Sequence, residues 1–203
     1  MLEGMICFGN KFVARSSMAL LLAGFATVPT VIPAKAASAS SSADRPTPNI
    51  NVRIYSFSGL SSWVLHGAEI EAKRLLRPVL IQLNWIDCTT QVVPASCMAP
   101  SLATDLSVRF IPKGLPKASE RALGLAAWTE NSAAAFIFYD RVIALRTHTR
   151  PLPVILGRVL AHEIMHLLFP TEGHSDVGLM RGQWTVDDLS IARSPWVSMN
   201  FIH

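Results

Sequence analysis

The sequence lacks concentrated positive charge. It has 203 residues, with 18 Lys and Arg against 14 Asp and Glu, and a formal net charge of +4. No cluster of basic residues with interleaved aromatic side chains is present, although such clusters are typical of nucleic-acid binding. A net charge this slight gives little attraction for nucleic acid or for an anionic membrane surface. We therefore expect neither of them as a partner.

The sequence also lacks an apolar run long enough to cross a bilayer, which takes about 20 residues. Its most hydrophobic segment, residues 18–28, has two basic residues before it and ends at Pro29. A small-residue Ala-Lys-Ala signal follows and ends at Ala36. This order predicts a secretory signal peptide over residues 1–36, with a membrane anchor as the alternative.

Removal of the predicted signal peptide would lower the net charge to about +2, with 15 basic and 13 acidic residues left. Residues 37–49 are small, polar and proline-bearing, which predicts a flexible leader. We expect one folded domain over residues 50–203. The predicted location is secreted or periplasmic, with no stable membrane insertion after cleavage.

Cysteine is scarce, with three residues in the chain. Cys7 falls in the predicted signal peptide, which leaves Cys88 and Cys97. An even pair in an oxidising compartment predicts a disulfide bond, with two buried thiols as the alternative. Neither cysteine has a histidine nearby in sequence, so a thiol nucleophile is not expected.

Hydrophobic periodicity predicts a mixed α+β domain around one sheet, with no internal repeat. Alternating apolar residues predict five strands, at residues 50–55, 79–85, 106–110, 123–128 and 134–139. Helical spacing predicts two main helices and a short last one, at residues 60–77, 154–169 and 186–193.

The strongest chemical signal is His162-Glu163-x-x-His166, inside the second predicted helix. Residues four apart on an α-helix lie on one side, so both imidazoles can reach one metal ion. Zinc binds neutral imidazole nitrogen at about 2.0–2.1 Å. Glu163 leans off that side, where it can take a proton from a zinc-bound water and return it to a leaving amine. The spacing predicts two zinc ligands and a catalytic base; the alternative is a histidine pair hydrogen-bonded within a core helix.

A catalytic zinc site needs a third protein ligand and one position open to water. His174 follows His166 by eight residues, beyond the helix-breaking Pro170, so the chain can turn back toward the metal. Imidazole is the more usual zinc partner, which favours His174 as the third ligand. Glu172 and Asp176 remain as alternatives.

These residues resemble the metzincin clan of zinc peptidases. The shared features are the His-Glu-x-x-His helix, a third histidine shortly after it, and a methionine-bearing turn, here Gly178-Leu179-Met180. The whole mature chain is also similar to small exported bacterial zinc peptidases of metzincin type. In these, a Phe-Tyr-Asp-Arg-Val segment precedes the Ala-His-Glu helix and a His-Ser…Gly-x-Met-Arg…Trp run follows it, here residues 138–142 and 174–184.

The resemblance implies a zincin-like α+β fold with a twisted mixed sheet, two main helices and a short C-terminal helix. It implies a Met-turn after the active-site helix, in which Met180 packs below the metal without binding it. It also implies that the strand at residues 123–129 binds an extended peptide at the edge of the sheet.

The chain departs from the metzincin pattern in two places. Metzincins usually have glycine three residues after the second histidine and the third histidine three residues later, where this chain has Phe169 and Glu172. The loop before His174 must therefore bend differently. No tyrosine follows Met180, so zinc itself would polarise the scissile carbonyl.

The prediction is an exported zinc-dependent metalloendopeptidase that acts on peptide or protein substrates. Its zinc ion would be held by His162, His166 and His174, and Glu163 would activate the attacking water. One alternative is a non-peptide zinc hydrolase of similar fold, because a ligand set does not define a substrate. Another is a non-catalytic protein that holds zinc for structure, which would tolerate the loss of Glu163.

Overall fold

The structure is a computed structural model of the whole chain. It describes residues 6–7, 48–90, 92–100, 102, 104–129, 132–170, 173–185 and 187–189. The predicted signal peptide and leader lie outside these residues, apart from β1 (Ile6–Cys7) and the last two leader positions. β1 pairs antiparallel with β7 (Gln183–Trp184).

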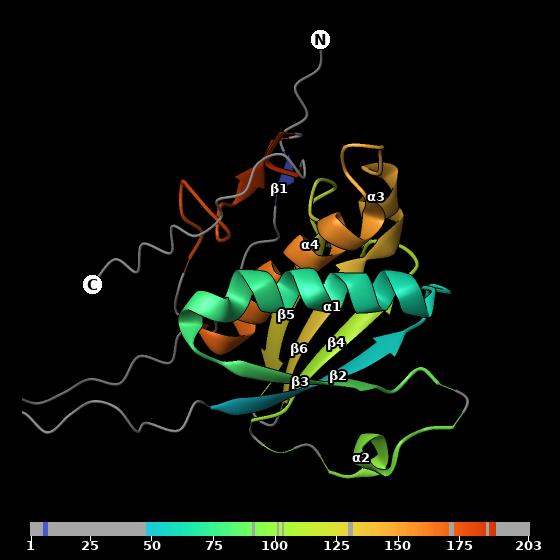
Figure 1. The fold of residues 1–203 in the computed structure, drawn as a ribbon. Coiled ribbons are helices and arrows are strands. Elements are labelled where there is room, and N and C mark those ends of the chain that lie inside the picture. Colours follow the sequence, from blue (N-terminus) through green and yellow to red (C-terminus); the bar gives the residue numbers. More distant parts are fainter. Residues whose placement is uncertain are drawn as a thin grey trace, which may run out of the picture. The chain divides into compact units, whose positions relative to one another are not determined.

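A five-stranded mixed sheet forms the centre of the fold (Figure 1). Its strand order is β3-β2-β4-β6-β5, in which β5 is antiparallel to its neighbour and the other pairs are parallel. The strands are β2 (Asn49–Ser56), β3 (Gln82–Asp87), β4 (Leu106–Ile111), β5 (Gly124–Thr129) and β6 (Ser132–Phe138). All five predicted strands are present, and the antiparallel β5 forms one edge of the sheet.

Alternation along the strands directs apolar side chains to one face, as the period of two requires. Val52 and Ile54 of β2 and Val108 of β4 have no exposed surface and belong to one hydrophobic core. Two helices cover this face, α1 (Ser62–Leu76) and α4 (Leu152–Leu168) (Figure 1). None of the helices that the structure describes is long and apolar enough to cross a membrane.

Close contact between α1 and α4 depends on a glycine at the crossing. A Cβ atom at Gly157 of α4 would come within 2.7 Å of the Ala68 carbonyl oxygen of α1. That separation is shorter than any normal contact, so only glycine allows the two backbones to approach this closely. The crossing fixes α4, which carries the His-Glu-x-x-His motif, against the core.

Boundaries differ from the prediction mainly after the first helix. A strand was predicted to begin at position 79, but this residue ends a 3₁₀ turn, η1 (Arg77–Val79). Leu80 follows with a positive φ of 52°. The left-handed residue turns the chain, so β3 starts three residues late. Two short helices were not predicted, α2 (Ala95–Met98) and α3 (Tyr139–Ala144). Both are too short to show a helical period.

The end of the chain is described only in part. Within the predicted helix at residues 186–193, the structure shows a 3₁₀ turn, η2 (Asp187–Leu189). Thr185 Oγ1 accepts a hydrogen bond from the Asp188 backbone N–H at 3.3 Å, as expected of a helix N-cap. The rest of that range lies outside the described residues.

The predicted disulfide is present between Cys88 and Cys97, with 5.7 Å between their Cα atoms. It closes the connection from β3 to β4, which contains α2. Arg53 on β2 holds the far end of this connection, because its guanidinium donates to the Ala99 carbonyl at 2.7 Å and to Asp105 at 2.7 Å. The disulfide loop is thus tied to the sheet on both sides.

Candidate metal centre

Helix α4 carries the first two histidines of the site. Pro153 is in its first turn, where a missing N–H is tolerated, and the helix ends at Leu168, two residues before Pro170. His162 and His166 lie on the same side of the helix and are 0% and 5% exposed. Their Nε2 atoms are 3.0 Å apart. The four-residue spacing therefore brings the two nitrogens together as expected.

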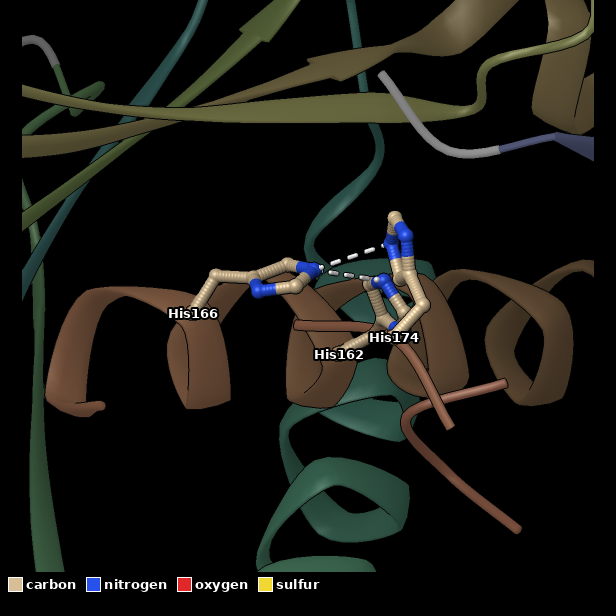
Figure 2. A group of neighbouring side chains, drawn as sticks. All are labelled: His162, His166 and His174. Atoms are coloured by element: carbon tan, nitrogen blue, oxygen red, sulfur yellow. Dashed lines mark hydrogen bonds between the residues drawn. The ribbon is translucent and has the colours of Figure 1, made fainter. Parts of the chain in front are cut away.

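His174 joins this pair from the chain that follows the helix. Its Nε2 is 3.2 Å from Nε2 of His166, and one nitrogen from each of the three rings lies within 4.8 Å of the others. Figure 2 shows these nitrogens directed at one another. Asp176 is exposed and does not belong to the group, while Glu172 lies outside the described residues.

The His162 ring is oriented by a backbone carbonyl. Its Nδ1 is 2.7 Å from the Leu179 carbonyl oxygen, and both atoms are buried. A carbonyl can only accept, so Nδ1 carries the proton and Nε2 presents its lone pair to the other two rings. Burial, together with the neighbouring His166, lowers the pKa of His162 well below its usual value. The ring is therefore neutral, which is the form that binds metals.

The separations suit a tetrahedral zinc ion. Nitrogen ligands at about 2.0–2.1 Å and tetrahedral angles stand about 3.3 Å apart. The Nε2 of His166 is 3.0 Å from that of His162 and 3.2 Å from that of His174, both close to that value, and the third pair lies within 4.8 Å. Three imidazoles, with at least one held in its neutral form by an outer carbonyl, are a donor set that zinc accepts. The residues present thus fit the metal that the motif predicts.

A tight turn separates His174 from the carbonyl that orients His162. The Ser175 N–H donates to the Met180 carbonyl at 2.8 Å, and the Arg181 N–H donates to the Gly178 carbonyl at 3.2 Å. Gly178 has a positive φ of 72°, which favours glycine there. Met180 is half-buried and packs against the core. This turn occupies the place in the sequence where the Met-turn was predicted.

Gly182 and Trp184, which follow the turn, both contact the histidines. A Cβ atom at Gly182 would lie 2.9 Å from Cγ of His174, so the imidazole rests against the glycine backbone. Trp184 on β7 is fully buried, and its ring centroid is 5.4 Å from that of His162 in an edge-on arrangement. The segment thus supports one histidine from its backbone and another from an aromatic side chain.

Glu163 lies beneath the edge strand. It is 1% exposed, and its Oε1 has no hydrogen-bond partner among the residues that the structure describes. A Cβ atom at Gly124, the first residue of β5, would be 2.6 Å from that oxygen. Burial raises the pKa of the Glu163 carboxyl to about 8. The carboxyl therefore occupies a narrow space that exists only because residue 124 is glycine.

The chain that enters β5 is held by Arg141 of α3. Its guanidinium donates to the Ala122 carbonyl at 2.7 Å and to the Ser119 carbonyl, and it stacks 4.8 Å from the Phe138 ring. These contacts fix the backbone immediately before Gly124. No sequence pattern indicates this role, because any residue type can supply the backbone carbonyls that Arg141 binds.

Comparisons with known proteins show only a remote likeness. No protein-family model matches the chain, and no curated protein matches it. Among solved structures, the chain is similar to archaemetzincin from Methanopyrus kandleri, with a TM-score of 0.44 and 15% identity. The match covers 73% of this chain and 90% of that one.

Proposed function

We propose that the protein is an exported zinc-dependent hydrolase that cleaves peptide bonds. The observation that carries this proposal is the convergence of His162, His166 and His174 next in sequence to a buried glutamate. Three histidines leave one tetrahedral position open, which is the arrangement of catalytic rather than structural zinc sites. Export is supported by the predicted signal peptide and by the disulfide bond, which oxidising compartments favour.

The three histidines would hold the metal, and each is restrained by a different part of the chain. His162 is restrained by the Leu179 carbonyl, His166 by its burial on α4, and His174 by the backbone of Gly182. Zinc bound in such a site lowers the pKa of a water ligand toward neutrality and polarises a substrate carbonyl. The protein's part is to keep the ligands in a fixed geometry, so that little reorganisation is needed on binding.

Glu163 is proposed as the general base and acid. A carboxylate at this position takes the proton from the attacking water and passes it to the leaving amine. Base action needs the ionised form, which a neighbouring cation favours against the effect of burial. Because Oε1 is not engaged in a hydrogen bond with any described residue, it is available for the transferred proton.

A peptide substrate is supported by the position of β5. This strand forms an edge of the five-stranded sheet, and its first residue contacts Glu163. An extended peptide can add to such an edge by main-chain hydrogen bonds, which places a peptide bond close to the catalytic groups. A substrate without a peptide main chain could not form these hydrogen bonds with the edge strand.

The deciding experiment compares wild type with Glu163→Gln. Purified protein without residues 1–36 is analysed for zinc and then incubated with a mixture of unstructured peptides, whose products are identified by mass spectrometry. We expect about one zinc per chain in both proteins and a loss of cleavage of about 10²–10⁴-fold in the variant.

Other outcomes separate the alternatives. Zinc without cleavage in the wild type would favour a protein that holds zinc for structure. Cleavage of small esters or amides without cleavage of any peptide would favour a non-peptide hydrolase. Absence of zinc from wild-type protein refolded with the metal would contradict the proposed function altogether.

A further inference from the structure

We propose that Arg158 and Asp188 are positioning residues, which clamp the segment bearing His174 to helix α4 and so set the affinity of the site for zinc. The inference rests on the proposed function, because it assumes that the three histidines bind the metal. It concerns two residues outside the histidine cluster.

Arg158 lies on α4 four residues before His162, on the same side of the helix. It is 1% exposed. Its Nε donates to Glu71 of α1 at 3.3 Å, and its Nη1 donates to the Asp188 backbone carbonyl at 2.6 Å. One guanidinium thus joins both main helices to the segment that follows the third histidine.

Asp188 is held through its side chain as well as its backbone. The carboxylate oxygen Oδ2 accepts from the Thr185 N–H at 2.7 Å, from the Thr185 hydroxyl at 2.8 Å and from Arg181 at 2.9 Å. Its carbonyl is bound by Arg158, so Asp188 connects α4 to two points of the preceding chain. A single residue therefore fixes how that chain lies on the helix.

These two points lead directly to the metal ligands. Arg181 pairs with Ser175 in a β-bridge, and Ser175 follows His174 in sequence. Between Arg181 and Thr185 lie Gly182, against which the His174 ring rests, and Trp184, which contacts His162. His174 itself is exposed, so burial in the core does not hold it in place. Trp184 and Leu189 of the same chain are buried in the core, and the polar contacts of Asp188 join them in holding the segment that bears His174.

Core packing does not explain a charged residue at position 158. Burial lowers the pKa of Arg158, although the carboxylates of Glu71 and Asp188 act in the opposite direction. Replacing a buried ion pair by an apolar side chain of similar size is often neutral or even stabilising. Arginine is instead suited to bridging, because its planar fork bonds two partners at once, which an apolar side chain cannot do.

The test is a double-mutant cycle on zinc affinity, measured by competition with a chromogenic chelator. The four proteins are wild type, Asp188→Ala, His174→Ala and the double variant. Asp188→Ala is expected to weaken zinc binding by about 10–100-fold, as the loss of outer partners of metal ligands typically does. If the clamp acts through His174, the double variant binds zinc no more weakly than His174→Ala alone.

Two further variants distinguish loss of the clamp from a general loss of folding. Arg158→Met removes the other side of the clamp and should reproduce the loss of affinity. Arg74→Gln is the matched control, since Arg74 also binds Glu71, at 2.7 Å, but its removal leaves the Arg158–Asp188 hydrogen bond in place. The control should bind zinc as the wild type does. Absorption spectra of the cobalt-loaded proteins report the ligand geometry and should change in Asp188→Ala but not in the control.

The outcomes distinguish this inference from the proposed function. Zinc affinity unchanged in Asp188→Ala, or an effect that adds in full to that of His174→Ala, would overturn the clamp while leaving a zinc site in place. Wild-type protein that binds no zinc would overturn the proposed function and the clamp with it.

Discussion

The two halves of the candidate metal centre are held by different forces. One half is α4, where His162, Glu163 and His166 are all at most 5% exposed and the helix packs against α1 and the sheet. The other half is the chain from His174 to Leu189, whose described residues form a two-residue strand, one 3₁₀ turn and the Ser175–Arg181 β-bridge. Its histidine is exposed, and the chain around it is held by hydrogen bonds and by three apolar side chains buried in the core, those of Leu179, Trp184 and Leu189.

The two halves therefore fix the positions of their metal-binding nitrogens in different ways. On α4 the helical period places two nitrogens side by side, and the hydrophobic core makes the helix rigid. In the following segment no period operates, so each contact must be made individually by a turn, a glycine or a charged side chain. We therefore expect mutations in the helical half to change stability and metal binding together, and substitutions of His174 and of the glycine beneath it to change metal binding alone.

The largest effect should come from removing a ligand on each side. In both His162→Ala and His174→Ala, zinc affinity should fall on the order of 100-fold, because a zinc-binding free energy of about 12 kcal/mol is shared among about four ligands. Without metal, His162→Ala should lose about 2–3 kcal/mol of stability through a buried cavity and a lost hydrogen bond, whereas His174→Ala should stay within about 0.5 kcal/mol of wild type.

Chelator competition and urea denaturation of the metal-free proteins measure the two quantities. Glu172→Ala serves as the control, and it should keep wild-type zinc affinity. Loss of zinc in Glu172→Ala but not in His174→Ala would move the third ligand to the glutamate and contradict the comparison.

A second effect should appear where the edge strand meets the carboxyl of Glu163, the proposed general base. In Gly124→Ala the new methyl group would lie 2.6 Å from Glu163 Oε1, so the carboxyl must move. A displacement of about 1 Å can cost about 10²-fold in rate. Peptide cleavage should therefore fall by up to that factor while zinc content stays at the wild-type level. Loss of zinc in parallel would show that Gly124 supports the fold of α4 rather than the position of the carboxyl.

The smallest effect should come from the glycine beneath His174. Gly182→Ala places a methyl group 2.9 Å from Cγ of the imidazole, which must shift. We expect zinc affinity to fall by about tenfold with the stability of the metal-free protein unchanged. Gly173→Ala is a matched control, because a Cβ atom there meets nothing within 4 Å. Equal losses in both variants would mean that the whole segment is sensitive to any substitution.

Much of the fold follows from local patterns. Alternating apolar residues located all five strands of the sheet, and the boundaries of α4 were predicted within two residues. The start of β3 was misplaced, because the left-handed turn at Leu80 has no glycine or asparagine to mark it. The short helices α2 and α3 were not predicted, because neither spans two full helical turns and so neither shows a helical period.

The histidines of α4 could be paired from their spacing alone, because a helix repeats its directions at a known interval. The cysteine count and the predicted oxidising compartment likewise sufficed to pair Cys88 with Cys97. The third metal ligand could be narrowed only to His174, Glu172 or Asp176, since the chain after α4 has no regular period. Long-range contacts determine where that histidine lies, among them Gly182, the Leu179 carbonyl and the Arg158–Asp188 hydrogen bond. Backbone carbonyls and glycines act there through position, which residue type does not encode.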